Sequence, residues 1–367
     1  MRYLILSVDY EIFGNGSGDV RQHVIEPTDR LARICEKQNV PLTVFFEVEE
    51  YLAFMRHAGQ LKRDLGYDPA ALIAKQIISL IGKGHDVQLH LHPEWHGACY
   101  QEGQWLLNPT KKNVDSLFDS QSEVDAYIES RKGVIEDLAA KAGSSQKVNV
   151  YRAGAFSAQP GRKLLAALAN NGFCIDSSVV RGLFSADRGY DYRLAPDAKG
   201  PWRVREDVAR EEAEGPLWEF PIYSVMGRRF NQLTFRTLRA KFSKNIPKVK
   251  QKEMVAQLNL NPSNPFKILR FLWQPVPIKL DFHNMNARKM LRWIDIAPKP
   301  ENGQCDALVF IGHTKEHIDD RPLEQLLSKL ADNPEVKVIS FWDLAHQMRT
   351  GWNDEVRKTV PKSPVLG

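Results

Sequence analysis

The segment KGHDVQLHLHPEWHG (83–97) shapes the interpretation of the whole chain, because it joins a strand pattern to a cluster of imidazoles. It holds four of the ten histidines and two acids. Its HDVQLHL portion (85–91) has the apolar pattern of a short buried strand. Such a segment is either a metal site or a polar corner of an ordinary fold. Residues elsewhere in the chain must distinguish the two.

Similar strand patterns recur along the chain, separated by helical ones. Short runs rich in β-branched residues predict strands over 3–9, 41–48, 85–91, 147–153, 173–178, 216–222, 306–312 and 335–341. Apolar residues at three- and four-residue spacing predict helices over 69–84, 122–143 and 159–172. Strand and helix alternating through seven or eight rounds indicate an α/β protein with a parallel sheet, either barrelled or doubly wound. In both architectures the chemistry lies at the C-terminal ends of the strands.

Composition indicates an ordinary globular protein: 367 residues, 43% hydrophobic and 26% charged. We expect a single domain over 1–367, with 225–300 as an insertion or irregular region within it. The four cysteines form no CxxC pair, which argues against thiolate zinc and redox motifs. The first apolar run is only about five residues long, shorter than a secretory signal needs, so a cytoplasmic location is expected.

A basic segment interrupts the alternation. Between Arg228 and Lys252 there are nine Lys or Arg residues and no acid. This segment could contact a phosphate-bearing substrate or an anionic membrane surface, or it could be a solvated loop. The overall net charge of +5 is mild, and no nucleic-acid partner is expected. Nothing in the sequence indicates an oligomeric state.

Carboxylates and imidazoles gather at the ends of two predicted strands. Asp9 ends the first strand, and Glu11 lies on the same face if the strand continues, roughly 6.6 Å further along. Burying an acid there is costly unless it is paired or bound to a metal. His90 and His92 share one face at the end of the third strand. Two imidazoles and one carboxylate suit a catalytic zinc or related divalent ion, whereas ordinary loop acids and core histidines are the alternative.

Five segments, in order, resemble the motifs of the polysaccharide deacetylases, which are carbohydrate esterase family four with the NodB homology domain. The segments are SVDYE (7–11), GHDVQLHLHPEWH (84–96), YRAGAFSAQP (151–160), GFCIDSSVV (172–180) and FIGHTKE (310–316). The resemblance implies a distorted (β/α) barrel of seven or eight mostly parallel strands with a basic insertion. It also implies a metal-dependent hydrolase of linear amides, which removes an N-acetyl group from a sugar.

The resemblance assigns roles to individual residues. Asp9 corresponds to the catalytic base, Arg152 to the cation that keeps it ionised, and His313 to the acid that protonates the leaving amine. The metal ligands would be Glu11, His90 and His92, with zinc the expected ion. This sequence departs from the family pattern in two places: Tyr10 stands where a second acid is usual, and Glu94 stands where the second histidine is usual.

Several further assignments stay open at this stage. Glu94 is an alternative metal ligand, and Asp176 could hold a ligand in place or merely cap a turn. The backbone N–H of Ala155 or Phe156 would stabilise the oxyanion. Expected substrate contacts are Tyr10, Phe156 and Trp95.

The substrate implied by the resemblance is an N-acetylated sugar or polysaccharide precursor, in surface-polysaccharide assembly such as lipopolysaccharide biosynthesis. One alternative is an amidohydrolase of the same superfamily that acts on another small non-peptide C–N bond. The other is a carbohydrate-binding relative that has lost catalysis, which the departures at Tyr10 and Glu94 would allow.

Overall fold

The computed structural model describes residues 1–196, 200–232, 265–300 and 305–350. At its centre lies a nine-stranded sheet in the order β10-β11-β7-β6-β3-β2-β1-β14, with β15 paired to β1 beyond that path. Neighbouring strands are parallel except in the β10–β11 pair. The strands are β1 (Arg2–Tyr10), β2 (Thr43–Glu47), β3 (Asp86–Leu91), β6 (Val150–Ala153), β7 (Ile175–Asp176), β10 (Trp202–Val204), β11 (Leu217–Glu219), β14 (Ala307–His313) and β15 (Val336–Val338).

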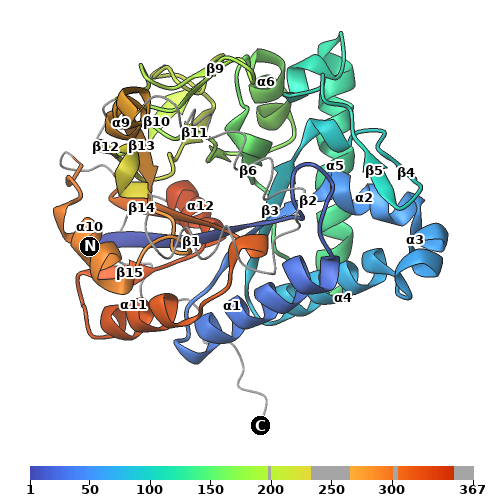
Figure 1. Cartoon of the computed structure of the whole chain (residues 1–367), viewed down its shortest axis with the longest axis horizontal. Helices are drawn as coiled ribbons and strands as arrows, with labels where there is room; N and C mark the ends of the chain where they lie inside the picture. The colour runs from blue at the N-terminus through green and yellow to red at the C-terminus, as the bar shows by residue number, and fades with distance from the viewer. Residues whose placement is uncertain (197–199, 233–264, 301–304, 351–367) are drawn as a thin grey trace.

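Helices connect these strands and cover the outside of the sheet (Figure 1). Helix α1 packs against α11, and α4 packs against α5. The helices are α1 (Glu26–Lys37), α2 (Val48–Arg56), α3 (Ala58–Leu65), α4 (Pro69–Gly82), α5 (Gln121–Lys141), α6 (Arg162–Asn170), α9 (Pro265–Trp273), α10 (Ala287–Ile296), α11 (Arg321–Ala331) and α12 (Phe341–Thr350). Among the described helices, none has both the length and the apolar character needed to cross a membrane.

The eight predicted strands and three predicted helices all form, with ends shifted by a few residues. The ninth strand of the sheet, β10, was not predicted. It has only three residues and adds antiparallel to β11 at the edge of the sheet. The observed architecture is the expected distorted (β/α) barrel of mostly parallel strands.

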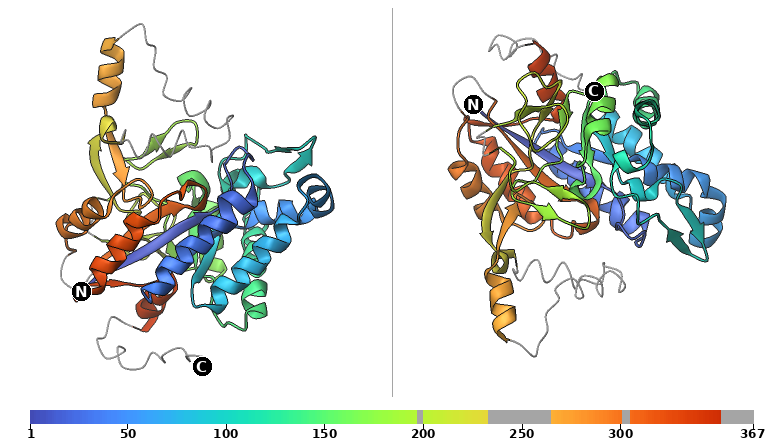
Figure 2. Two further views of the ribbon diagram at one scale, coloured as in Figure 1. Left: turned by 60° about the horizontal axis from the view of Figure 1, so that its bottom comes forward. Right: turned by 90° about the horizontal axis from the view of Figure 1, so that it is seen from above.

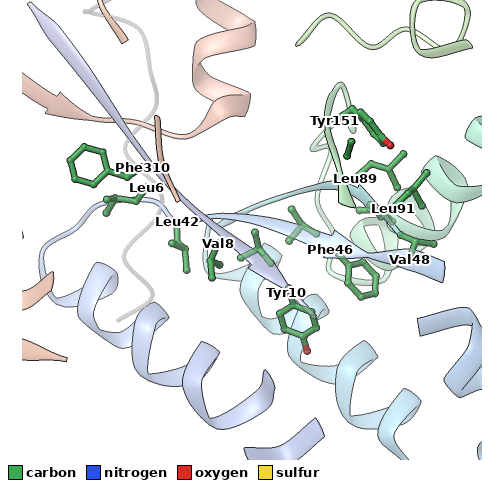
Figure 3. Packing of buried hydrophobic residues seen from close by; sticks show 14 of the residues in the cluster. Leu6, Val8, Tyr10, Leu42, Phe46, Val48, Leu89, Leu91, Tyr151 and Phe310 are labelled. Carbon is green, nitrogen blue, oxygen red and sulfur yellow. The ribbon is translucent and has the colours of Figure 1, made fainter. Parts of the chain in front are cut away.

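The two faces of strand β1 lie in different environments, one in the main hydrophobic core and the other inside the barrel. Leu4, Leu6, Val8 and Tyr10 belong to the main hydrophobic core between the sheet and the helices. Figure 3 shows Leu6, Val8 and Tyr10 on that side of the strand. Because side chains alternate along a strand, Asp9 must point to the other side, into the barrel.

The curled sheet closes through single bridges instead of a continuous ladder. Ile222, just beyond β11, pairs with Val180 on one side and with Val309 of β14 on the other. The interior of this barrel holds a second apolar cluster, which includes Ile5 and Val309. Helix α12 closes the end of the barrel at which the parallel strands begin, with Phe341, Leu344 and Ala345. Some polar side chains are buried near α12, where Asp86 accepts from Thr43 and Gln88. The predicted site residues lie at the opposite, upper end, where the parallel strands finish.

Three small hairpins and several short helical turns lie outside the main sheet. The hairpins are β4 (Cys99–Gln101) with β5 (Gln104–Leu106), β8 (Phe184–Ser185) with β9 (Tyr190–Asp191), and β12 (Ser224–Arg228) with β13 (Pro275–Lys279). The turns are η1 (Arg21–Ile25), η2 (Pro93–Trp95), η3 (Val114–Ser116), η4 (Gly154–Phe156), η5 (Arg229–Gln232) and η6 (Thr314–Glu316). The predicted irregular region 225–300 thus contains a β-ribbon and two helices among its described residues. Most of the basic segment, 233–252, lies outside the described residues.

The floor of the barrel should be important for stability. Leu344 of α12 is fully buried, so Leu344→Ala should lower the free energy of unfolding by about 2–5 kcal/mol, because it removes apolar contacts and leaves a cavity. Leu194→Ala is the matched control, because its side chain is 88% exposed and its loss should change stability by less than about 0.5 kcal/mol. Urea denaturation measures both. Equal effects would show that α12 is not part of the core.

Candidate active site

The parallel strands bring four predicted site residues to one end of the barrel. Asp9 on β1 is in register with His313 on β14, although the two lie far apart in sequence. His90 on β3 is in register with Arg152 on β6. In the sheet order, only β2 lies between these two pairs of strands. Topology alone therefore gathers two imidazoles, a carboxylate and a guanidinium at the C-terminal end of the strands.

Asp9 and Arg152 form a buried ion pair. Nη1 of Arg152 lies 2.7 Å from Oδ1 of Asp9, and the guanidinium is fully buried. Its other N–H groups donate to the carbonyl of Ser177 (3.0 Å) and to the hydroxyl of Ser7 (2.9 Å). The ring of Phe45 lies 3.9 Å below the guanidinium carbon. Arg152 is therefore held in one position, with its charge matched.

This environment keeps Asp9 ionised. Burial alone would raise the pKa of the Asp9 carboxyl, but Arg152, His90 and His313 together bring it below its ordinary value. Oδ1 is used by Arg152, whereas Oδ2 lies 3.5 Å from Nε2 of His313. Asp9 thus has one oxygen fixed by the protein and a second oxygen that faces the site.

Glu11, His90 and His92 make the strongest candidate metal site. One ligand atom from each lies within 4.8 Å of the other two, and all three residues are buried. Oε2 of Glu11 is 2.7 Å from Nε2 of His92 and 3.6 Å from Nε2 of His90. The three predicted ligands therefore lie together, and their role as metal ligands stays a prediction.

The orientation of His90 is what a metal ligand requires. Its Nδ1 lies 2.8 Å from the carbonyl oxygen of Arg152, a contact that fixes the ring and directs Nε2 towards Glu11. Nε2 is buried and has no hydrogen-bond partner among the described residues. A buried nitrogen without a hydrogen bond is costly, and a cation between the rings would satisfy it. These residues therefore fit a divalent ion, and the N₂O donor set suits zinc.

Lys315 was not predicted, yet it binds the same carboxylate. Its ammonium lies 2.7 Å from Oε1 of Glu11 and 3.0 Å from the carbonyl oxygen of Ile12. Burial would raise the pKa of Glu11, but Lys315 and His92 hold it well below its usual range. Glu11 consequently offers one oxygen to Lys315 and the other to the imidazoles. Lys315 follows His313 by two residues, and that spacing was the available signal in the sequence.

Two buried acids fix the backbone on either side of the cluster. Glu47 caps α2 and also accepts a 2.5 Å hydrogen bond from the backbone N–H of His92. Glu50 accepts from the backbone N–H of Ile12 at 3.1 Å. Burial, together with the neighbouring Glu11 charge, raises the pKa of both carboxyls well above the usual range. The sequence analysis identified neither acid, because Glu47 lies just before α2 and Glu50 lies within it, outside any recognisable motif.

His313 faces Asp9 through Nε2 and acidic groups through Nδ1. Nδ1 is 3.8 Å from Oε2 of Glu316, and Asp281 completes a group of three within 4.8 Å. Asp281 was not predicted. It reaches the site because it pairs with Ile311 of β14 through a single bridge. Gly312 permits this approach, since a Cβ there would lie only 2.4 Å from the ring of His283.

The turn after β6 presents backbone groups to the same end of the barrel. Ala155 and Phe156 both adopt positive φ, +48° and +62°, which is uncommon for residues with a side chain. Gly154 packs so closely on His92 that a Cβ would lie 2.5 Å from the imidazole ring. The turn is thereby tied to the candidate metal ligand, as expected for the segment proposed to stabilise an oxyanion.

Two predicted substrate contacts are wrong. Tyr10 points out of the barrel into the core, is 1% exposed, and donates from its hydroxyl to Gln76. Trp95 is also 1% exposed and packs against Trp105. Neither side chain is accessible to a substrate. Phe156 is partly buried beside the site, so its substrate contact stays a prediction.

Glu94 and Asp176, whose roles the sequence left open, both have partners within the protein. Glu94 binds Arg188 at 2.6 Å, its other oxygen stays 3.9 Å from Nδ1 of His92, and it joins no cluster of potential ligands among the described residues. Asp176 accepts from the N–H and hydroxyl of Ser178. It therefore orders the turn whose Ser177 carbonyl holds Arg152. Neither acid lies where a metal ligand is needed.

Comparison with known proteins gives structural similarities only. No family model matches the chain, and no curated protein matches its sequence. A Mycobacterium smegmatis structure assigned as a polysaccharide deacetylase is similar at 16% identity and a TM-score of 0.47, covering 100% of this chain and 94% of that one. A second structure with that assignment, from Pseudomonas aeruginosa PAO1, gives 14% identity and a TM-score of 0.43, with coverage of 98% and 92%.

PuuE allantoinase is similar at 11% identity and a TM-score of 0.43, with coverage of 95% of this chain and 90% of that one. Polysaccharide deacetylases, which the motifs predicted, are thus among the structures that this chain resembles. At these identities and TM-scores, neither an activity nor a metal passes from them to this chain.

The Asp9–Arg152 pair should make stability depend on pH. Asp9→Ala should cost about 3–5 kcal/mol at pH 7, because it leaves Arg152 buried and unpaired. Since the pKa of Asp9 is lowered in the folded chain, its contribution is present above the ordinary value of 3.8 and is lost as pH falls through the lowered value. The difference between wild type and variant should therefore shrink towards pH 3.

Urea denaturation at pH 7 and pH 3 measures this effect. Glu206→Ala is the control, because it removes an exposed partner of Arg162 and should cost less than about 1 kcal/mol at pH 7. An Asp9→Ala penalty that is the same at both pH values would contradict the assignment of an ionised, paired Asp9.

Proposed function

We propose that this protein is a metal-dependent hydrolase of a linear amide, removing an N-acetyl group from a sugar or polysaccharide precursor. The observation that carries the proposal is the meeting of two units at one end of the barrel. One is the Arg152-bound carboxylate of Asp9, and the other is the Glu11, His90 and His92 cluster. The sugar, and a role in surface-polysaccharide assembly, are supported by the motif resemblance alone.

The chain's own residues can carry out each proton transfer. The free oxygen of Asp9 would take the proton of the attacking water, while Arg152 keeps the carboxylate oriented. A divalent ion held by Glu11, His90 and His92 would polarise the acyl oxygen and make water acidic enough to attack near neutral pH. The turn at Ala155 and Phe156 would donate backbone N–H groups to the developing oxyanion.

His313 would complete the reaction. As the acyl carbon–nitrogen bond breaks, its Nε2 would donate a proton to the departing amine. Glu316 and Asp281 lie on the Nδ1 side of the same ring. Asp9 and His313 therefore act as a base and an acid on neighbouring strands, 3.5 Å apart across the site.

The metal assignment predicts which replacements abolish binding. His90→Ala and His92→Ala should each lower the affinity for Zn²⁺ by at least about 100-fold. Replacing a residue that only hydrogen-bonds to a ligand already lowers metal affinity by about 10- to 100-fold. Glu94→Gln should change the affinity by less than about tenfold, because Glu94 is engaged by Arg188. Isothermal titration of the metal-depleted protein measures all three. Full binding by His92→Ala, with binding lost in Glu94→Gln, would reverse the ligand assignment.

The catalytic assignment predicts a selective effect at His313. His313→Ala should reduce acetate release from N-acetylglucosamine oligomers by about 10²–10⁴-fold, with the bound zinc unchanged. His317→Gln is the control, because Nε2 of His317 is bound to Asp320 at 2.7 Å and His317 belongs to none of the candidate ligand groups among the described residues. Unaltered turnover in His313→Ala would require a different acid.

The substrate screen also separates the alternatives. Metal-dependent cleavage of other linear or cyclic amides, without acetate release from sugars, would favour the hypothesis that the protein is an amidohydrolase acting on another small C–N bond. Sugar binding without hydrolysis by the zinc-loaded protein would favour a binding protein.

A further inference from the structure

A β-ribbon and a helix form an arm that stands apart from the barrel. The arm consists of β12, η5, α9 and β13, and Figure 2 shows it projecting from the rest of the described chain. The two strands pair antiparallel from Ser224 opposite Lys279 to Arg228 opposite Pro275. At the base, the N–H of Leu280 donates to the carbonyl of Tyr223 at 2.8 Å. The arm is therefore an ordered element with a fixed base.

Large apolar side chains are exposed along this arm. Of the twelve large hydrophobic residues exposed in the described chain, four lie here: Met226 (58%), Phe230 (44%), Leu269 (54%) and Trp273 (53%). The rings of Phe230 and Trp273 contact each other, with centroids 5.7 Å apart. Single exposed apolar residues need no explanation, but an exposed aromatic pair on an arm that also exposes Leu and Met indicates a binding surface.

The charge of the arm has one sign. Residues 224–232 and 265–280 contain five Lys or Arg residues and no acid. The Arg228 guanidinium lies 5.6 Å from the Trp273 ring centroid, and that of Arg229 lies 4.2 Å from the Phe271 ring centroid. Cations are thus interleaved with aromatic rings, and the arm supplies no carboxylate to neutralise them.

We propose that the arm docks on an anionic lipid membrane. Trp and Phe favour the interface between headgroups and acyl chains, and each nearby Lys or Arg is attracted by anionic headgroups. A membrane supplies negative charge and an apolar layer together, whereas a free phosphate would leave the exposed rings uncovered. This proposal goes beyond the hydrolysis proposed above and does not depend on it.

The base of the arm lies at the candidate active site. The ammonium of Lys279 at the end of β13 is 4.5 Å from the ring centroid of Phe156. Two residues later the chain reaches Asp281 beside His313. An arm seated on a membrane would thereby hold the catalytic end of the barrel close to lipid-borne substrates.

Co-sedimentation of the full chain with vesicles tests the proposal. The protein should bind vesicles of phosphatidylglycerol and phosphatidylcholine at 50 mM NaCl, and binding should weaken strongly at about 500 mM because salt screens surface charge. Vesicles of pure phosphatidylcholine should bind much less.

Two variants separate charge from apolar insertion. Arg228→Gln with Arg270→Gln should weaken binding about 25-fold, at roughly fivefold for each cation lost. Phe230→Ala with Trp273→Ala should weaken it by roughly tenfold or more, because the apolar contact is lost. The side chains of Arg228, Phe230, Arg270 and Trp273 are all exposed, so both variants are expected to fold. Circular dichroism checks this.

A matched control changes charge elsewhere. Arg56→Gln with Arg63→Gln removes two exposed cations near α3, on the far side of the molecule from the arm (Figure 1), and should leave vesicle binding within twofold. Equal losses in this control and in the arginine variant of the arm would overturn the proposal. So would absence of vesicle binding, or binding that ignores lipid charge. Self-association that is lost in Phe230→Ala with Trp273→Ala, without vesicle binding, would instead assign the arm to a second copy of the chain.

Discussion

The buried pairing of Arg152 with Asp9 is the interaction on which the upper end of the barrel depends. A guanidinium with no exposure to solvent is tolerated only when its charge is matched and its N–H groups are bonded. The Asp9 carboxylate supplies the charge, and the Ser7 hydroxyl and the Ser177 carbonyl supply the remaining acceptors. Those three acceptors come from β1 and from the turn after β7, so the pair also joins distant parts of the barrel.

A second ion pair, between Lys315 and Glu11, lies beside the pair of Arg152 and Asp9. Lys315 neutralises Glu11 on the side away from the imidazoles. Burial raises the pKa of Glu47 and of Glu50, which favours the uncharged form of both carboxyls. The net charge within this buried region is therefore close to balanced before any ion binds. Burial lowers the pKa of His90, but Asp9 and Glu11 more than reverse that effect. The position between the rings thus attracts a cation, whether a proton or a metal ion.

Much of this arrangement could be predicted from the sequence, for a physical reason. Parallel strands buried on both faces are apolar throughout, so an acid or a histidine at a strand end is conspicuous. Asp9, His90 and His92 were found in this way, whereas His313 was assigned from the motif resemblance. Tyr10 was misassigned, although strand alternation already places it on the opposite face from Asp9. Asp281 and Glu50 reach the site from a loop and a helix, and their position depends on tertiary packing that no local pattern encodes.

The central claim is that Glu11, His90 and His92 hold a divalent ion beside the Asp9 base. X-ray absorption spectroscopy at the zinc edge, on the full chain loaded with one equivalent of Zn²⁺, tests it most directly. The expected first shell contains two imidazole nitrogens at about 2.0–2.1 Å and oxygen ligands at about 2.0–2.2 Å, with one imidazole lost in His92→Ala. A shell with a thiolate, with a single imidazole in the wild type, or with no change in His92→Ala would contradict the claim.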